Sequence, residues 1–383
     1  MTIFHREPLL FSKDEFKPSS NINDVCKTYG IGKIDRVVES TITESAEEYS
    51  LEMDVHRSCN VFNELVKFNL ILADGQLFRI YDTEYDSYKQ TKNIYAKHIS
   101  YDLDFDSFYD LKYKDNNTVV TTVINNIVKK TQYSNMSVTT NLGRFKSTKI
   151  KDDLSDNTLF EGLLNVIEKL KEYTAEDGNE IDIEIVRDNT NIKFYLYEAN
   201  KDYTSSTYKD SAGSGKDTGI RLDISKIKGV VITESDEDFC TKVIAKGKDD
   251  KVVKDITHPT LGKNGLPFWI TKVVSFSDES NTTTLRKLGQ AHIIVNSLNI
   301  KNIKVDLEDV VETDFFKKIT AYKDLNLYDK LWIKHPDLSD TYISFRIVKI
   351  EKDINGNLKG IELGELNNDF AKTLKKAIKK YSN

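Results

Sequence analysis

The sequence predicts a mainly β protein that carries α+β insertions. Three observations lead to this class. Short runs that alternate apolar with polar residues fill both ends of the chain, as half-buried strands do. Segments with helical periodicity interrupt these runs in the middle of the chain. A hairpin-sized stretch near the N-terminus also recurs near the C-terminus, which predicts two related β units.

Composition sets limits on the class of protein. The chain has 383 residues, of which 39% are hydrophobic, enough for two or three domains of roughly 150 residues each. No apolar run approaches the roughly 18 residues of a membrane span, and the N-terminus has no apolar segment typical of export. The three cysteines, Cys26, Cys59 and Cys240, are too far apart to indicate a disulfide framework or a CxxC site.

The first β region is expected to cover residues 1–105. Residues 49–55 alternate apolar with polar side chains, and residues 66–73 and 77–81 flank Asp74-Gly75, a pair that favours a hairpin turn. Many short strands in succession are typical of a small barrel or sandwich. We therefore expect a first β-barrel here.

The middle of the chain follows a different pattern. Residues 118–133 and 157–173 each place apolar side chains on one helical face, and residues 181–196 read as a hairpin. A polar loop rich in Gly and Ser follows at 201–219. Residues 106–218 are therefore expected to form a helix-plus-hairpin α+β insertion that ends in this loop.

Strand patterns return in the last part. Residues 219–366 predict a second β-barrel, with a helix-bearing excursion at about 250–300 in which residues 282–298 are helical. Residues 367–383 predict a basic C-terminal helix. The net charge of −6 includes this lysine-rich end, so the rest of the chain is acidic and disfavours a general nucleic-acid-binding role.

One internal repeat relates the two β regions. At an offset of 267, residues 78–94 align without a gap with residues 345–361, with seven identities in 17 positions. Each copy reads as a strand–turn–strand hairpin. Two interpretations stay open: chance convergence among abundant residue types, or two related barrels, one near each end of the chain.

Signatures of catalysis are missing from the sequence. It contains no HExxH, HxH or GxSxG motif. Residues 211–216 resemble a phosphate-binding loop, but Asp210 stands where the motif needs Gly and Asp217 where it needs Ser or Thr. We interpret this segment as a flexible linker and predict no catalytic, cofactor or metal site.

Two segments are candidates for contact with a partner. Asp102, Asp104 and Asp106 alternate with apolar residues, which predicts a strand with an acidic edge that is solvated or faces a partner; a divalent cation is the less favoured alternative, since Ser107 stands where a calcium loop needs Gly. The second candidate is the C-terminal helix, either a docking helix for an acidic partner or a solvated surface helix. Its lysines are Lys372, Lys375, Lys376, Lys379 and Lys380, and the first four are the candidates for contact with the partner.

Several segments together resemble a known family. Residues 74–80 (DGQLFRI) and 94–103 (IYAKHISYDL) look like the N-terminal barrel of phage tail hub proteins, and residues 241–247 and 325–331 fit the later pattern. These proteins are often described as prophage endopeptidase tail or phage minor structural proteins. Tyr328 stands where that family has Gly in a Leu-Gly-Asp turn, which leaves the turn type open.

The resemblance implies a structural role. It implies two related small β-barrels per chain that form a pseudo-sixfold ring as a homotrimer, with no cofactor, no membrane and no sequence-specific nucleic acid. Such a hub would join a sixfold tail tube, or a tube-initiator protein, to a threefold central spike. The tape measure protein and the inner baseplate or wedge subunits are further implied partners. The implied location is the tail baseplate of a phage or phage-tail-like bacteriocin, assembled in the bacterial cytoplasm.

Two other functions are kept as alternatives. A tail-associated cell-wall endopeptidase would need a nucleophile and a base, for which Cys59 and His98 are the candidates. In the family, catalytic domains follow the hub, and this chain is expected to end soon after the second barrel. A receptor-binding or glycan-binding tail protein would need clustered exposed aromatic side chains.

Overall fold

A computed structural model describes most of the chain. The described residues are 8–13, 30–105, 107–108, 112–129, 136–153, 157–176, 181–198, 215–223, 230–235, 240–257, 269–276, 279–296, 300–306, 325–336 and 339–364. Strands dominate among them, and three α-helices are present in this part of the chain. The mainly β class with α+β insertions is therefore confirmed.

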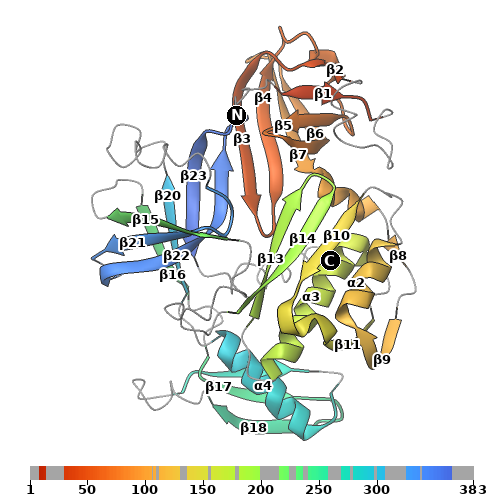
Figure 1. Ribbon diagram of the computed structural model, residues 1–383, viewed down its shortest axis with the longest axis vertical. Helices are drawn as coiled ribbons and strands as arrows, with labels where there is room; N and C mark the ends of the chain where they lie inside the picture. The colour runs from red at the N-terminus through yellow and green to blue at the C-terminus, as the bar shows by residue number, and fades with distance from the viewer. Residues whose placement is uncertain are drawn as a thin grey trace.

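One large sheet organises the molecule (Figure 1). It has 13 strands in the order β16-β20-β23-β22-β3-β4-β7-β6-β5-β1-β2, and β21 and β15 extend it beside β22. Its N-terminal strands are β1 (Leu9–Phe11), β2 (Gly30–Lys33), β3 (Val37–Ser45), β4 (Tyr49–His56), β5 (Leu70–Ala73), β6 (Gln76–Asp86) and β7 (Thr91–His98). Its later strands are β15 (Asp217–Asp223), β16 (Val230–Ser235), β20 (Ile300–Asp306), β21 (Lys330–His335), β22 (Ser339–Lys352) and β23 (Leu358–Gly364).

No sheet of the described strands closes into a barrel, in contrast to the predicted pair of barrels. The physical reason lies at the centre of the sheet. Strand β22 pairs with β3 along residues 349–352, so the two β regions are joined edge to edge into one continuous sheet. An edge used to join the two regions is not available to close either one on itself.

The strand pattern of the sequence agrees with burial in this sheet. In β4 the side chains of Leu51, Met53 and Val55 are buried, whereas Glu52 is exposed and Asp54 is half-buried. Successive strand residues point to opposite faces, so this alternation places one face of β4 against the core. The predicted hairpin around Asp74-Gly75 is confirmed, since β5 and β6 pair antiparallel on either side of it.

The inserted region packs two helices against small sheets. Helices α2 (Val120–Val128) and α3 (Leu159–Glu176) overlap the two predicted helices, and the predicted hairpin is β13 (Ile181–Asp188) with β14 (Asn191–Glu198). Thr158 and Glu161 form a capping box at the start of α3, in which each side chain accepts the backbone N–H of the other residue. The remaining strands are β8 (Ser107–Phe108), β9 (Lys112–Val119), β10 (Ser137–Asn141), β11 (Lys149–Asp153) and β12 (Asn157–Thr158).

A second insertion lies between β16 and β20. Strands β17 (Lys242–Lys246), β18 (Val252–Thr257) and β19 (Thr271–Ser275) form a separate sheet, and α4 (Thr282–Asn296) covers it (Figure 1). Leu285 and Ile293 of α4 pack into its small core. The predicted helix-bearing excursion and the helix at 282–298 correspond to these elements.

Within the residues that the structure describes, no α-helix is both long enough and apolar enough to span a membrane.

Candidate assembly interface

The large sheet contains the same arrangement of five strands twice. We call strands β3, β4, β7, β6 and β5 the first sheet unit, and strands β16, β20, β23, β22 and β21 the second sheet unit. In each unit the strands are neighbours in this order. Along the chain the corresponding strands also come in matching order, β3, β4, β5, β6 and β7 in the first unit and β16, β20, β21, β22 and β23 in the second. The two units are joined where β22 of the second meets β3 of the first.

The strand register between β6 and β7 over residues 79–84 matches that between β22 and β23 over residues 346–351, and a second irregularity, between Glu351 and Lys352, occurs in the second unit alone among these described strands. Ile80 lies opposite Ala96 and Thr83 opposite Ile94 between β6 and β7. Between β22 and β23 the residues 267 positions later occupy these places: Ile347 is opposite Leu363, and Ile350 is opposite Ile361. A bulge interrupts the register after Ile80 and again after Ile347. The sequence repeat therefore marks a structural repeat, with its irregularity preserved.

The two units also share a second repeated sequence, which is separate from the repeat predicted at offset 267. Ile42-Thr43-Glu44-Ser45 of β3 is identical to Ile232-Thr233-Glu234-Ser235 of β16. The two tetrapeptides hold the same place, because Ile42 lies opposite Leu51 of β4 and Ile232 opposite Ile303 of β20. Their offset is 190 rather than 267, since the insertion between β16 and β20 lengthens the second unit. A search at one fixed offset misses this signal.

In the first unit, the turn before β5 is hydrogen-bonded to β6. The Phe68 N–H donates to the Ile80 carbonyl at 2.8 Å, and the Ile80 N–H donates to the Asn69 carbonyl at 2.9 Å. Phe68 has a positive φ of 73°. The Asn69 side-chain oxygen accepts the backbone N–H of Lys13 at 3.0 Å.

The second unit repeats this turn before β21. The Tyr328 N–H donates to the Ile347 carbonyl at 2.8 Å, and the Ile347 N–H donates to the Asp329 carbonyl at 2.9 Å. Tyr328 has a φ of 71°, and Asp329 Oδ1 accepts the N–H of Lys216 at 3.0 Å. Tyr328 therefore takes the left-handed conformation that Gly adopts more readily, which answers the question of turn type left open by the sequence.

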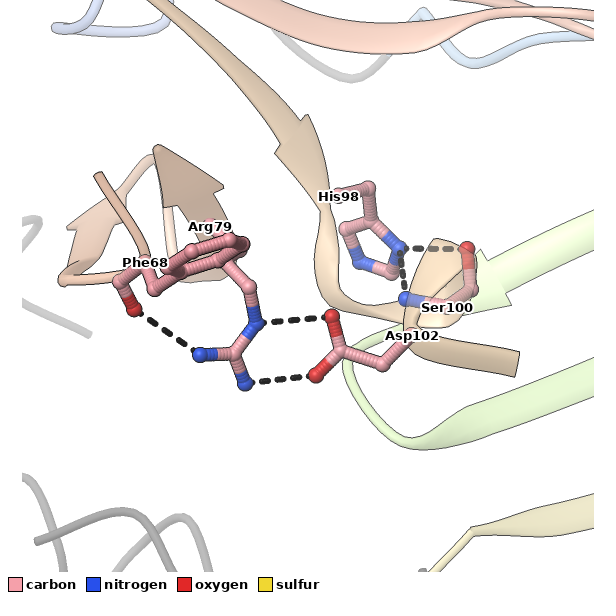
Figure 2. Close-up of polar contacts among 5 residues, drawn as sticks. All are labelled: Phe68, Arg79, His98, Ser100 and Asp102. Carbon is pink, nitrogen blue, oxygen red and sulfur yellow. Dashed lines mark hydrogen bonds and ion pairs between the residues drawn. The ribbon is translucent and has the colours of Figure 1, made fainter. Parts of the chain in front are cut away.

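Each unit also buries an arginine at the same position. Arg79 of β6 forms a two-point ion pair with Asp102, with Nε at 2.8 Å from Oδ1 and Nη2 at 2.5 Å from Oδ2 (Figure 2). Its third nitrogen, Nη1, donates to the Phe68 carbonyl at 2.8 Å. Asp102 lies in the 3-10 helix η2 (Ile99–Phe105) and is fully buried.

The equivalent arginine of the second unit binds a different element. Arg346 of β22 pairs with Glu184 of β13, and both side chains are buried. The hairpin β13–β14 thus supplies to the second unit the buried carboxylate that η2 supplies to the first. Buried charges need such a partner, so these ion pairs fix where η2 and the hairpin dock on the sheet.

The segment that carries the strongest family resemblance is a polar cluster inside the core (Figure 2). His98 is fully buried and stacks on Tyr49, with ring centroids 4.4 Å apart. The Ser100 N–H donates to His98 Nδ1 at 3.2 Å, so the ring proton is on Nε2, which faces Gln76 Oε1 at 3.2 Å. Burial lowers the pKa of His98 well below its usual value. The segment is thus a set of satisfied internal contacts.

The predicted acidic strand differs from what the structure shows. Residues 99–105 form a 3-10 helix instead of a strand, because Asp102 turns inward to Arg79. Asp104 is partly buried and accepts the Thr158 hydroxyl at 3.0 Å, and desolvation raises its pKa to about 6. Asp106 lies outside the described residues. Asp102 is thus not available to a partner, and a partner-facing role for Asp104 and Asp106 stays a prediction.

Residues named for other chemistry occupy structural positions. Cys59 is 5% exposed and His98 is fully buried, so neither presents a reactive group at the surface. Lys216, from the segment that resembles a phosphate loop, accepts the Lys330 N–H at its carbonyl and donates its own N–H to Asp329. Among the described residues no group of three or more His, Cys, Asp or Glu side chains could hold a metal ion. Lys372, Lys375, Lys376 and Lys379 lie outside the described part of the chain.

The junction between the units brings three parts of the described chain together. Residues 349–352 of β22 lie antiparallel to residues 42–45 of β3. Arg187 of the β13–β14 hairpin is buried beside it and donates to the carbonyls of Ser45 at 2.9 Å and Ala46 at 2.6 Å. Lys359 of β23 donates to Thr41 Oγ1 at 3.1 Å. The junction thus joins both units and the hairpin.

A cavity of about 560 Å³ lies next to this junction. Glu44, Asp74, Arg187 and Lys352 line it, together with residues of both units and the hairpin. Desolvation raises the pKa values of Glu44 and Asp74 above those of free carboxyl groups, and the charges of Arg187 and Lys352 limit the rise for Glu44. The cavity therefore has mixed charge and belongs to the contact between the units.

Comparison with known proteins gives a likeness of fold. No family model matches the chain, and no curated protein matches its sequence. Prophage tail protein gp18 of Listeria monocytogenes EGD-e aligns with a TM-score of 0.61 at 14% identity, over 99% of this chain and 100% of that one. A tail protein of Neisseria meningitidis MC58 gives 0.55 at 12% identity, over 94% and 97%.

A third structure agrees with these two. The 43 kDa tail protein of prophage MuSo2 from Shewanella oneidensis aligns with a TM-score of 0.54 at 13% identity, over 85% of this chain and 92% of that one. This chain has the fold of prophage tail proteins, and the predicted resemblance is confirmed at that level. The match with the Listeria protein covers nearly the whole length of this chain and of the Listeria chain, so it includes both sheet units and both insertions.

Proposed function

We propose that this protein is a structural component of a phage tail or phage-tail-like particle, and that it works as a baseplate hub. The observation that carries the proposal is the duplicated sheet unit. One chain presents the same arrangement of strands twice, with the same register over residues 79–84 and 346–351 and a bulge at the same place, after Ile80 and after Ile347. The tail-protein fold supports the location in a tail.

The duplication explains how such a hub would match two symmetries. Three copies of the chain in a ring would present six similar sheet units, three first and three second. A sixfold tail tube could contact all six, whereas a threefold central spike would contact features present once per chain. Closed rings are the usual form of homo-oligomers, so we propose a homotrimer as the adaptor between tube and spike.

The chain would divide its work among four regions. We propose that residues 1–105 and 219–366 form the ring, that 106–218 is an inserted brace between them, and that 367–383 docks on a partner. The proposed partners are the tail tube or tube initiator, the central spike, and the tape measure and wedge subunits of the baseplate. Assembly in the bacterial cytoplasm would precede incorporation in the particle.

Native mass measured over a concentration series, together with negative-stain imaging, tests the trimer. We expect a species of three times 43.9 kDa with a central hole, and its fraction should rise with concentration as mass action requires. Particles with some other fixed copy number, or a monomer at every concentration up to the solubility limit, would contradict the homotrimer.

A further inference from the structure

One edge of the first sheet unit is open at a position where the second unit is paired. Residues 349–352 of β22 lie between β23 and β3. The equivalent residues of β6, 82–85, pair with β7 on one side. On their other side no strand of the described part of the chain pairs with them. Strand β5 begins at Leu70, opposite Arg79, and so does not reach residues 82–85.

The side chains and backbone of β6 reflect this open edge. Ile350 is 1% exposed in the junction, whereas its counterpart Thr83 is only half-buried and the next residues, Glu84 and Tyr85, are exposed. Tyr85 is 45% exposed although it is aromatic. The Thr83 N–H donates to the side chain of Asp82 at 3.0 Å instead of to a neighbouring strand.

The matching open edge belongs to the second sheet unit. Strand β3 pairs with β4 on one side and with β22 on the other. Its counterpart β16 pairs with β20 and ends the sheet among the described strands. Residues 232–235 of β16 repeat the sequence of residues 42–45, the four residues of β3 that contact β22. Beside them Val231 is 54% exposed.

We propose that the open edge of β6 in one copy of the chain pairs with the open edge of β16 in a second copy. The pairing would follow the register of the junction within the chain. Transferred by the two offsets, Asp82 would lie opposite Ser235, Thr83 opposite Glu234, Glu84 opposite Thr233, and Tyr85 opposite Ile232. The inference rests on the proposed ring and names the surface that forms it.

Side-chain placement supports this register. Neighbouring strand residues point to opposite faces, so Thr83 and Tyr85 would share one face with Ile232 and Glu234. Tyr85 then meets Ile232, and a pair of an aromatic with a β-branched side chain stabilises adjacent strands. A shift of one residue would turn Tyr85 away from Ile232.

The contact is head to tail, because the two edges differ. Each copy would donate one edge of each kind, so the contact can continue around a ring until the ring closes. An exposed strand edge left unpaired is a hazard for aggregation. Ring closure would cover both edges in every copy, and the internal junction shows that this chain already forms such a contact once.

Cysteine crosslinking tests the pairing on the full chain. The double variants Thr83→Cys/Glu234→Cys and Glu84→Cys/Thr233→Cys each place two thiols directly opposite each other, where a disulfide can span adjacent strands. We expect oxidation to give covalent dimers and trimers on a non-reducing gel, at least tenfold more than in the parent chain. A ladder that stops at three copies is the expected result for a closed trimer.

Two controls define the contact. The variant Thr83→Cys/Thr233→Cys has the same number of added thiols on opposite faces, and we expect little crosslinking from it. A mixture of the single variants Thr83→Cys and Glu234→Cys should give dimers only, because each copy then carries one half of one contact. Equal crosslinking in matched and mismatched pairs would overturn the register, and no crosslinking in either matched pair would overturn the interface.

The outcomes also separate this inference from the proposed function. A trimer by native mass in which neither matched pair crosslinks would keep the trimeric ring and reject the β6–β16 contact. Crosslinking through the matched pairs that proceeds to a ladder without an end, in particles of no fixed size, would keep the contact and reject the closed trimer.

Discussion

Phe68 and Tyr328 occupy the same turn of the two sheet units and share a left-handed backbone, with φ of 73° and 71°. Their side chains have different surroundings. Phe68 is 47% exposed, whereas Tyr328 is fully buried. The Tyr328 hydroxyl donates to the Ile185 carbonyl at 3.2 Å and accepts the Ile185 N–H at 3.1 Å. The second unit therefore uses this position to hold the β13–β14 hairpin, whereas in the first unit the Phe68 side chain is about half exposed.

Loss of the Tyr328 hydroxyl should weaken the chain. In the variant Tyr328→Phe, the buried N–H and C=O of Ile185 lose this partner, which costs about 1–3 kcal/mol of unfolding free energy. Urea unfolding followed by circular dichroism measures the change. Tyr88→Phe is the matched control, since Tyr88 is 95% exposed and its change should be within about 0.5 kcal/mol. Equal effects of the two variants would contradict a docking role for Tyr328.

The ion pair between Arg346 and Glu184 should be costly to break from one side. Arg346→Met leaves the buried Glu184 carboxylate without its partner, and such a change costs about 3–5 kcal/mol. Thermal and urea unfolding both measure it. The double variant Arg346→Met/Glu184→Leu removes both charges and should recover most of the loss.

An exposed ion pair gives the comparison for that prediction. Lys67 and Asp82 lie 3.1 Å apart, with side chains more than half exposed, so Lys67→Met should cost less than about 1 kcal/mol. A loss in Arg346→Met as small as in Lys67→Met would show that the buried pair does not hold the hairpin on the second unit.

The raised pKa of Asp104 predicts that the stability of the chain depends on pH. Desolvation raises the pKa of Asp104 to about 6 in the folded chain, against about 3.9 in an unfolded chain. The folded state therefore binds more protons between these values, and stability from this group falls as the pH rises from about 4 to about 6. In Asp104→Asn this part of the pH dependence should vanish, and the variant should be more stable at pH 7 by up to about 3 kcal/mol.

The measurement is the difference in unfolding free energy between parent and variant from pH 4 to pH 7. Glu44 and Asp74 also have raised pKa values, but they are present in both chains and cancel in the difference. Asp86→Asn is the control, because Asp86 is partly exposed and backbone hydrogen bonds lower its pKa, which gives a small effect of the opposite sign. A flat difference curve for Asp104→Asn would contradict the prediction.

Asp329 should not tolerate replacement by the amide that its counterpart Asn69 carries. Asp329 accepts two backbone N–H groups, from Lys216 at Oδ1 and from Asn326 at Oδ2, each at 3.0 Å. In Asp329→Asn one of these N–H groups would face an NH₂ group, so we expect a loss of about 1–3 kcal/mol in urea unfolding. Asn69 instead donates its amide to the Glu64 carbonyl at 2.8 Å, which explains why each unit keeps its own residue.

The control for Asp329 is the turn residue Asp353. It also accepts two backbone N–H groups, from Asn355 and Asn357, but these contacts are exposed to water. Asp353→Asn should therefore change the unfolding free energy by less than about 1 kcal/mol. If the two variants behave alike, burial of the Asp329 contacts does not matter to the turn.

Much of the fold could be predicted because burial leaves a periodic trace in the sequence. The alternation in β4, the helical faces of α2 and α3 and the hairpin of β13 and β14 each depend on neighbours within a few residues. The repeat at offset 267 was visible because nothing is inserted between β6 and β7 or between β22 and β23 beyond their turns. Local pattern was a sufficient guide in all these cases.

The rest depended on contacts between distant residues. The alternation at 101–106 predicts a strand, but Asp102 is held by Arg79, 23 positions away, and this buried ion pair overrides the local pattern. The junction of β22 with β3 joins residues about 300 positions apart, and no property of either strand alone indicates it. The repeated tetrapeptide at residues 232–235 was visible in principle, but only with an offset that the insertion had changed.

The pairing of β3 with β22 has a consequence for synthesis of the chain. Ribosomes make residues 42–45 long before residues 349–352, and domains generally fold as they emerge. The first sheet unit can therefore form while the outer edge of β3 is still bare. During that interval the nascent chain carries an uncovered strand edge that could join another chain. Arrival of β22 covers this edge from within the same molecule, so a chain cut short before residue 349 would keep it exposed and should aggregate during expression.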